Sequence, residues 1–335
     1  MVDAMAGLLK STLAERIVRY DDLVPCLNAF IDTRTPGSEQ KENFTIIGPG
    51  VSENPNQYVH IAEPHGFNIG GARQPPHCVN SQHSHDTAEV FVVHSGKWRF
   101  DFGENGEDAS LAASPGDIVS FPTHAFRGFT NIGSETGFLW SVLGGDDPGR
   151  VTWAPRVFEM ARDYGLALLE NGALIDTSAG ECPPRGVSLM PPTSRADIAA
   201  LTKLTPSEAS RLVVRSEDEP SSPGEFANLP GVVDSPVIGE AISELGIEAA
   251  PLGWSHGFRV SRLKLEKGAS IPSYVRDQHE VYFVQSGSIT VTLGDETAQL
   301  NAGDTVTVPV GLPRSLESAA GALLFRVLGD HASKS

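Results

Sequence analysis

The stretch "NSQHSHDTAEVFVVHSG", residues 80–96, combines metal-ligand side chains with the pattern of a buried β-strand. Its first half sets His83, His85 and Glu89 at even spacings, and its second half is rich in Val and Phe, which favour strands. Because alternate side chains of a strand share one face, these three residues are expected to point into one interior. If they converge on one point, two imidazoles and a carboxylate would suit a metal ion.

The chain repeats this pattern near its end. Three segments recur in the same order and with nearly constant spacing: "HGFNIG" (65–70) and "HGFRVS" (256–261), "AEVFVVHSGKW" (88–98) and "HEVYFVQSGSI" (279–289), "SPGDIVSFPTHAFRG" (114–128) and "NAGDTVTVPVGLPRS" (301–315). An internal repeat of this kind indicates the duplication of one structural unit. The chain is therefore expected to hold two copies of one domain.

Each copy is expected to fold as short antiparallel strands. "EVFVV" and "VYFVQ" predict strands, and a Gly-Asp turn leads into "IVSFP" and "TVTVP", two further strands that proline ends. The 34 glycines and 24 prolines among 335 residues favour many turns. The sequence thus predicts an all-β protein with two jelly-roll barrels in tandem.

Short helices are expected at the N-terminus and between the barrels. Apolar residues form a stripe over residues 4–20, residues 153–165 have helical periodicity, and residues 205–212 open with a capping box. The expected domains are, in order, an N-terminal helical or extended arm (1–58), the first barrel (59–150), a helical segment and linker with strands that complete the barrels (151–245), and the second barrel (246–335).

The charge balance limits the classes of partner. With 25 basic and 42 acidic residues, the net charge is −17, which repels phosphate backbones and anionic lipid, so nucleic acids and membranes are not expected. Three widely spaced cysteines, the lack of a secretory pattern and the lack of a long apolar run predict a cytoplasmic protein. The expected partners are a small-molecule substrate that can carry negative charge and further copies of the chain, in a homodimer or a larger homo-oligomer.

The first copy resembles the cupins, a family of small β-barrels with two signature motifs. The first motif, G-x(5)-H-x-H-x(3,4)-E-x(6)-G, is matched in spacing by His83, His85, Glu89 and Gly96, while His77 stands at its leading glycine. The resemblance extends to the second copy and implies a two-domain cupin, or bicupin. It also implies one divalent metal in the first barrel, with iron(II) favoured over manganese, nickel or zinc, held by the two histidines and the glutamate.

The second motif, G-x(5)-P-x-G-x(2)-H-x(3)-N, is matched only in part, by Gly116, Pro122 and Asn131. The family's fourth ligand, a histidine, is replaced by Arg127, which cannot bind a metal because it has no free lone pair. The family's turn glycine is replaced by His124, a second candidate for a catalytic role. An inward Arg127 either forms a buried ion pair with Glu89, without a metal, or binds an anionic substrate group beside a metal held by three ligands.

The second copy, over residues 250–330, has lost the histidines. Tyr274 and Arg276 replace them, Glu280 is retained, and Arg314 stands at the position of the fourth ligand. Glu280 with either arginine predicts a buried salt bridge and no metal. We therefore expect a barrel that is structural, or a small-molecule pocket that has lost its metal.

The family resemblance implies an oxidoreductase. The leading hypothesis is a mononuclear iron(II) dioxygenase that acts on a small organic substrate of the aromatic, flavonol-like, diketone or enol type, with Arg127 offsetting the negative charge of the substrate. The alternative is a non-catalytic or regulatory bicupin that binds a small molecule and keeps a vestigial metal site.

Overall fold

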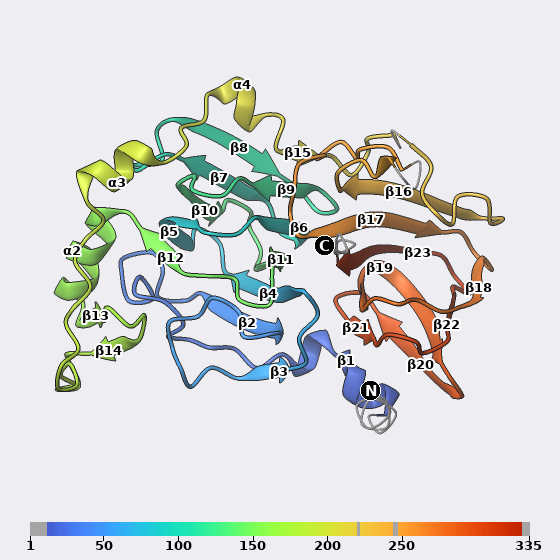
Figure 1. The fold of residues 1–335 in the computed structure, drawn as a ribbon, viewed down its shortest axis with the longest axis horizontal. Helices are drawn as coiled ribbons and strands as arrows, with labels where there is room; N and C mark the ends of the chain where they lie inside the picture. Colours follow the sequence, from blue (N-terminus) through green and yellow to red (C-terminus); the bar gives the residue numbers. More distant parts are fainter. Residues whose placement is uncertain (1–11, 220–221, 244–246, 330–335) are drawn as a thin grey trace. The chain divides into compact units, whose positions relative to one another are not determined.

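Two units make up the computed structural model (Figure 1), which describes residues 12–219, 222–243 and 247–329. The N-barrel unit spans Val24–Ser216, and the C-barrel unit combines residues 1–23 with residues 217–335. These limits differ from the expected ones. The arm expected over residues 1–58 is divided at residue 23, and the linker expected over residues 151–245 is divided at residue 216.

The N-barrel contains a seven-stranded and a five-stranded sheet. The seven-stranded sheet runs in the order β15 (Val213–Val214), β9 (Ile118–Phe121), β6 (Glu89–Ser95), β11 (Gly137–Gly144), β4 (Phe67–Gln74), β2 (Glu42–Ile47) and β3 (Val59–Ile61). The five-stranded sheet runs in the order β12 (Val151–Trp153), β5 (Val79–His85), β10 (Arg127–Asn131), β7 (Trp98–Phe102) and β8 (Ala109–Ala113). Apart from the parallel pair β2–β3, neighbouring strands are antiparallel, as in a jelly-roll barrel.

The pattern of apolar residues explains which strands have one covered face and which have two. In β7, Trp98, Phe100 and Phe102 are buried and alternate with more exposed polar residues. β6 and β11 are apolar at successive positions and buried along nearly their whole length, which is typical of strands with two covered faces. The turn into β9 depends on Gly116, whose φ of +87° lies in the left-handed region and whose N–H donates to the oxygen of Val93 at 2.8 Å.

The C-barrel is a single nine-stranded sheet. Its main path runs through β1 (Ile17–Val18), β21 (Thr305–Val308), β19 (Glu280–Leu293), β23 (Ala322–Gly329), β17 (Phe258–Leu265) and β16 (Val232–Ile238). The first half of β19 pairs with β21 and β23, and its second half pairs with β20 (Glu296–Asn301) and β22 (Arg314–Glu317), which also pairs with β18 (Ser270–Tyr274). The 14-residue β19 therefore connects the two sets of strands.

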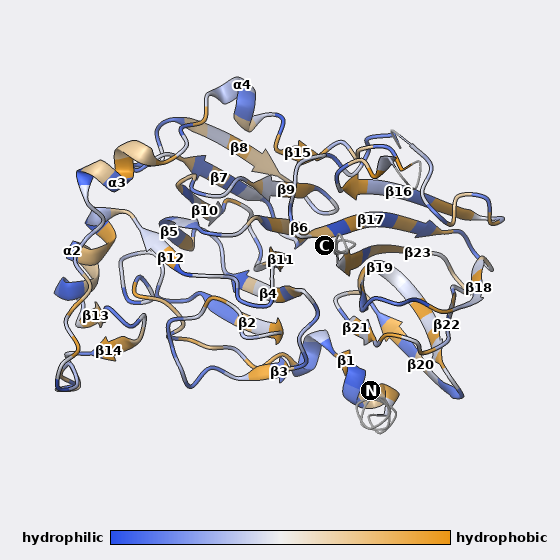
Figure 2. Cartoon of the chain, in the orientation of Figure 1, coloured by the Kyte–Doolittle hydropathy of each residue, from blue (hydrophilic) through white to orange (hydrophobic). Residues whose placement is uncertain are grey.

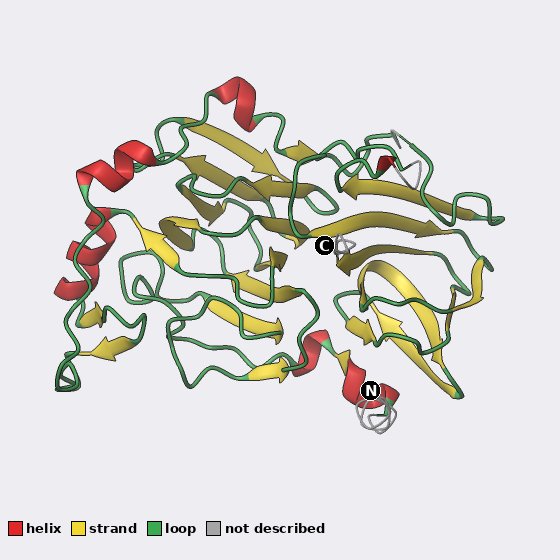
Figure 3. Cartoon of the chain, viewed as in Figure 1, coloured by secondary structure: helices red, strands yellow, loops and turns green. Residues whose placement is uncertain are grey.

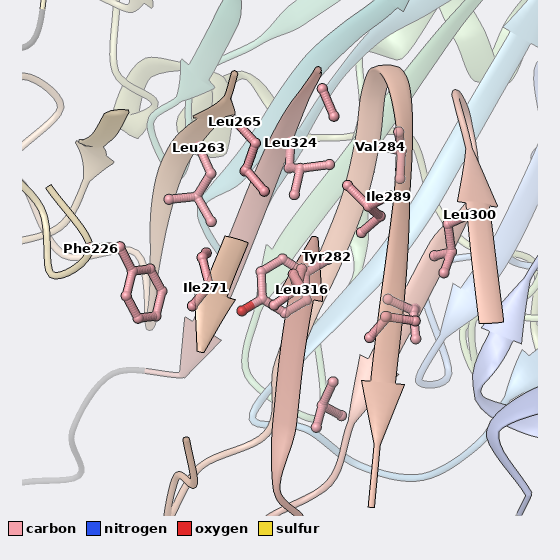
Figure 4. Packing of buried hydrophobic residues seen from close by; sticks show 14 of the residues in the cluster. Phe226, Leu263, Leu265, Ile271, Tyr282, Val284, Ile289, Leu300, Leu316 and Leu324 are labelled. Atoms are coloured by element: carbon pink, nitrogen blue, oxygen red, sulfur yellow. The ribbon is translucent and has the colours of Figure 1, made fainter. Parts of the chain in front are cut away.

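Apolar side chains fill the interior of the C-barrel. Figure 4 shows side chains from several strands that gather in this core, among them Leu263, Leu265, Val284, Ile289 and Leu324. Hydrophobic and hydrophilic residues alternate along β17 in Figure 2, because one face of this strand packs on the core while the other does not.

Helices are few and short (Figure 3). Within residues 12–219, 222–243 and 247–329, the α-helices are α2 (Pro155–Asp163), α3 (Arg195–Ala200) and α4 (Pro206–Ala209). A small hairpin of β13 (Leu166–Leu168) and β14 (Leu174–Asp176) follows α2. The predictions of a helix within residues 153–165 and of a capped helix from Thr205 are confirmed. No helix in the described part of the chain is long and apolar enough to cross a membrane. The predicted all-β fold with two barrels and short helices is confirmed.

The helix expected over residues 4–20 is wrong in its described part, and residues 1–11 lie outside the described residues. The elements observed there are the 3-10 turn η1 (Leu13–Arg16), β1 and the 3-10 turn η2 (Tyr20–Asp22). The β-branched Ile17 and Val18 pair with β21 and do not continue a helix. Leu13 is buried in the C-barrel core, so this segment belongs to the second barrel.

Candidate metal centre

The three predicted ligands of the N-barrel come together. His83 and His85 lie at the end of β5, and Glu89 begins β6. One potential ligand atom from each residue lies within 4.8 Å of the others, and all three side chains are buried. β5 and β6 belong to different sheets, so the convergence arises from two strands and the bend between them, and not from one strand face as the even spacing suggested.

The protonation of both histidines suits metal binding. Nδ1 of His83 donates a hydrogen bond to the backbone oxygen of Ser81 at 2.7 Å, which leaves the lone pair on Nε2. Burial, and next the charge of Arg127, lower the pKa of His83 and of His85 well below the usual value. Both imidazoles are therefore neutral, which is the form that binds a metal.

Arg127 lies at the start of β10 and is paired with His83 of β5 in the strand register. Its Nη2 donates to Oε2 of Glu89 at 2.5 Å, and its guanidinium lies 5.5 Å from the ring centroid of Phe121. Burial raises the pKa of Glu89, and the charge and hydrogen bond of Arg127 oppose this rise. Nε and Nη1 of Arg127 are buried and have no hydrogen-bond partner among the described residues. Arg127 thus points inward, pairs with Glu89 and keeps two unused donors.

His124 is not brought into this cluster. Its side chain is exposed, and its φ of +57° is left-handed, at the position where the cupin motif has glycine. Its backbone N–H donates to the oxygen of His85 at 3.1 Å. His124 therefore contacts the end of β5 through its backbone, and its ring does not take the place of the missing fourth ligand.

A cavity of about 70 Å³ reaches all three ligand residues. Most of its other walls are apolar or small, including Gly70, Ala72, Phe91, Phe129, Leu143 and Trp153. Trp153 packs against the imidazole of His83, with ring centroids 5.3 Å apart. The cluster of ligands therefore faces a small, mainly apolar space.

Three buried ionisable residues near this cavity, Asp32, Lys41 and Glu53, were not predicted from the sequence. Lys41 forms a fully buried ion pair with Asp32, and its Nζ also donates to Oδ1 of the cavity residue Asn80 at 3.0 Å. Glu53 accepts a hydrogen bond from Nε1 of Trp153 at 2.6 Å, and burial raises the pKa of Glu53 to about 8. No motif contains these residues, and the sequence carries no signal that brings Glu53 to a tryptophan 100 residues away.

In the C-barrel, the equivalent positions form a network of hydrogen bonds and ion pairs. Glu280 is fully buried and accepts hydrogen bonds from Nε of Arg276 at 3.0 Å, Nη1 of Arg314 at 3.3 Å and the hydroxyl of Tyr274 at 2.8 Å. The predicted buried salt bridge is confirmed, and it includes both arginines that were proposed for it.

Comparison with known proteins identifies the class of fold. A model of the Cupin domain matches residues 72–143 and 261–327. Similar solved structures include an oxalate decarboxylase of Lactobacillus farciminis in a formate complex (11% identity, 96% of this chain and 87% of that chain, TM-score 0.56), a vicilin of Capsicum annuum (13%, 95% and 87%, 0.55) and AerE of Microcystis aeruginosa (12%, 95% and 100%, 0.51). No curated protein sequence matches the chain.

The two matched segments lie one in each barrel, so the chain is a bicupin. At these sequence identities, the solved structures establish the fold and not the activity. The donor set of the N-barrel itself fits a divalent metal, because two neutral imidazoles and one carboxylate form a facial triad with open coordination positions.

Proposed function

We propose that the N-barrel is the active site of a metal-dependent cupin oxygenase, a mononuclear dioxygenase in which His83, His85 and Glu89 bind one iron(II). The observation that supports this proposal is the convergence of the three ligand atoms within 4.8 Å in a buried site. When bound, the metal supplies Lewis acidity and open positions for the substrate and dioxygen. Manganese, nickel or zinc would use the same ligands.

Arg127 has two tasks in this proposal. Its Nη2 holds Oε2 of Glu89, the oxygen that lies 3.7 Å from Nε2 of His85, and hydrogen bonds to a ligating carboxylate commonly fix its orientation in this way. Its buried Nε and Nη1 are the donors for an anionic oxygen of the substrate. Arg127 therefore both positions a ligand and offsets the charge of the substrate.

The cavity volume restricts the proposed substrate. At about 70 Å³, the cavity is well below the roughly 300–1,000 Å³ of sites that bind drug-sized ligands. Among the substrate classes expected from the sequence, this volume favours a small enol or diketone over a flavonol. The apolar walls suit the carbon skeleton of such a substrate.

Metal analysis and oxygen uptake test the proposal together. Plasma emission should find about one metal per chain in the wild-type protein, and His83→Ala or His85→Ala should remove it. Oxygen uptake should occur with acetylacetone and not with a flavonol. Tyr274→Phe, at the equivalent position of the C-barrel, is the matched control and should leave both readings unchanged. Metal that survives both histidine substitutions would show that the ligand assignment is wrong.

The second candidate function is a non-catalytic bicupin that binds a small molecule without turnover. The hydrogen bond of 2.5 Å between Arg127 and Glu89 favours it, because an arginine can neutralise the buried carboxylate without a metal. Stoichiometric iron without oxygen uptake, or no iron at all, would favour this second function.

A further inference from the structure

The C-barrel contains a cluster of three arginines, two buried and one partly exposed, around two fully buried carboxylates. Arg276 and Arg314 pair with Glu280, at 3.0 and 3.3 Å. Arg326, which is also buried, pairs with Asp234 at 3.3 Å. Three guanidinium groups thus face two fully buried carboxylates, which leaves an excess of one positive charge. An excess charge in a largely buried cluster requires a counter-charge nearby.

Glu225 supplies that counter-charge from the loop before β16. Its Oε2 accepts hydrogen bonds from Arg276 Nη2 and, at 3.2 Å, from Arg326 Nη1. Unlike the other two carboxylates, Glu225 is half exposed, with 47% of its side chain accessible. Nε of Arg326 is buried and has no hydrogen-bond partner in the described part of the chain. Glu225 therefore pairs with Arg276 and Arg326 from the solvent-exposed side. Breaking these exposed ion pairs and hydrating the Glu225 carboxylate costs little free energy.

A pocket of about 670 Å³ opens beside these groups. Arg276, Arg326 and Glu225 line it together with a third arginine, Arg259, and its apolar walls include Pro236, Ile238 and Leu328. This volume lies within the range of small-molecule sites, at roughly 300–1,000 Å³. Charged donors at one side and apolar walls at another match a ligand that is polar at one end only.

We propose that this pocket binds a monocarboxylate with an apolar body. The carboxylate of the ligand takes the place of Glu225 on Arg276 and Arg326, because guanidinium groups bind carboxylates through paired, charge-assisted hydrogen bonds. The apolar body packs against Pro236, Ile238 and Leu328. This site is separate from the metal centre of the N-barrel and needs no metal, so it stands or falls independently of the proposed oxygenase activity.

Calorimetric titration of the full chain with 3-phenylpropanoate tests the site, and 3-phenylpropanamide is the matched neutral ligand. The titrations are made in the His83→Ala background, so that a metal in the N-barrel does not contribute. The acid should bind and the amide should not. Glu225→Gln removes the carboxylate that competes with the ligand for Arg276 and Arg326. It should tighten the binding of 3-phenylpropanoate about fivefold, which corresponds to the free energy of one exposed ion pair.

Two variants on the pocket wall should weaken the binding. Arg276→Gln removes a charged donor and should cost at least about tenfold in affinity. Because this change also disturbs Glu280, Gln278→Glu serves as a second variant that adds a negative charge to a partly exposed lining residue and should also weaken binding. The proposal would be overturned if the acid and the amide bound equally well, or if the acid bound neither with Glu225 in place nor after Glu225→Gln. It would also be overturned if Arg276→Gln and Gln278→Glu both left the affinity unchanged.

Discussion

Arg127 and Arg314 occupy equivalent positions in the two barrels, and each pairs with a buried glutamate. What differs is the surroundings of the glutamate. Two neutral histidines adjoin Glu89, whereas a tyrosine and a second arginine bind Glu280. The same arginine–glutamate pair is thus combined with metal-ligand side chains in the N-barrel and with a closed hydrogen-bond network in the C-barrel. Variants at the two arginines therefore separate the effect of the ion pair from that of a metal.

Arg127→Met is expected to destabilise the metal-free protein and to respond to iron. The substitution leaves the carboxylate of Glu89 alone in a buried site, and breaking such a pair costs about 3–5 kcal/mol in the free energy of unfolding. Added iron(II) should recover most of this loss, because the metal would then neutralise Glu89. Melting temperatures with and without iron measure both effects.

Arg314→Met is the matched control for this experiment. It breaks the equivalent pair with Glu280, and iron should not restore the stability lost on this substitution, because Tyr274 and Arg276 stand in place of the ligand histidines around that glutamate. If the Arg127→Met protein loses the same stability with and without iron, the Arg127–Glu89 pair acts alone and the proposed metal site is wrong.

Glu53 should make the protein less stable as the pH rises. Burial raises the pKa of Glu53 from 4.5 to about 8, so between these values the folded chain keeps a proton that the unfolded chain has released. The free energy of unfolding therefore falls across this window, by on the order of 1 kcal/mol per pH unit from this group. Glu53→Gln removes the titration and should flatten the pH dependence, measured by urea unfolding at several pH values. Glu107→Gln, at an exposed position, is the control and should leave the slope of the unfolding free energy against pH as in the wild type. Equal slopes in the wild type and both variants would contradict the role given to Glu53.

At the scale of the element, the N-terminal segment shows how a local pattern can mislead. A stripe of apolar residues over residues 4–20 satisfies a helical period, yet Ile17 and Val18 form an edge strand on β21. The N–H groups of Leu13 and Tyr20 donate to acidic side chains of the C-barrel, Glu296 at 2.9 Å and Asp304 at 3.0 Å. Those partners lie more than 280 residues away, so no local period could predict them.

Leu13→Ala is expected to destabilise the C-barrel. The side chain is 4% exposed and packs in the core, and removal of a buried leucine side chain costs about 2–5 kcal/mol. Hydrogen exchange should show faster exchange in β19–β21, the strands next to β1. Leu27→Ala, where the leucine is 60% exposed, should change neither stability nor exchange. Unchanged exchange in the Leu13 variant would mean that this segment does not support the barrel.

The elements that carry the site were largely predictable. Strands β6 and β9 follow from short apolar runs bounded by turns, and the ligand spacing matched a motif whose fold fixes where the residues meet. The sequence left two roles open for Arg127, because it carries no distance to Glu89, and the structure shows the buried ion pair between the two side chains. The third arginine of the C-barrel cluster was also missed, since Arg326 and Glu225 belong to no motif.

At the scale of the whole molecule, the duplicated domain has produced two chemically different interiors. The N-barrel encloses a cavity of about 70 Å³ beside neutral histidines, and the C-barrel opens a pocket of about 670 Å³ beside arginines. The chain carries a net charge of −17, so a pocket lined by three arginines, Arg259, Arg276 and Arg326, is unusual in it and marks a place where an anion is favoured. One fold thus provides two distinct kinds of binding chemistry in a single chain.

Several large apolar side chains remain exposed on residues 24–58 of the N-barrel. Val24, Leu27 and Tyr58 are 42%, 60% and 53% exposed. Val24 and Tyr58 are neighbours, because the N–H of Val24 donates to Nε2 of His60 at 3.1 Å and the Tyr58 ring lies 4.8 Å from the His60 ring. Exposed apolar residues that gather in this way are typical of surfaces that associate.

We propose that this surface supports a homodimer, the smallest assembly expected from the sequence. Light scattering should then give about twice the chain mass of 35.6 kDa. Because each chain carries a net charge of −17, added salt should screen the repulsion and raise the dimer fraction. Tyr58→Glu should yield monomers, whereas Tyr164→Glu, at a similarly exposed tyrosine outside this surface, should not. A wild-type mass of 35.6 kDa at every salt concentration would refute the dimer, and a dimer that survives Tyr58→Glu would place the interface elsewhere.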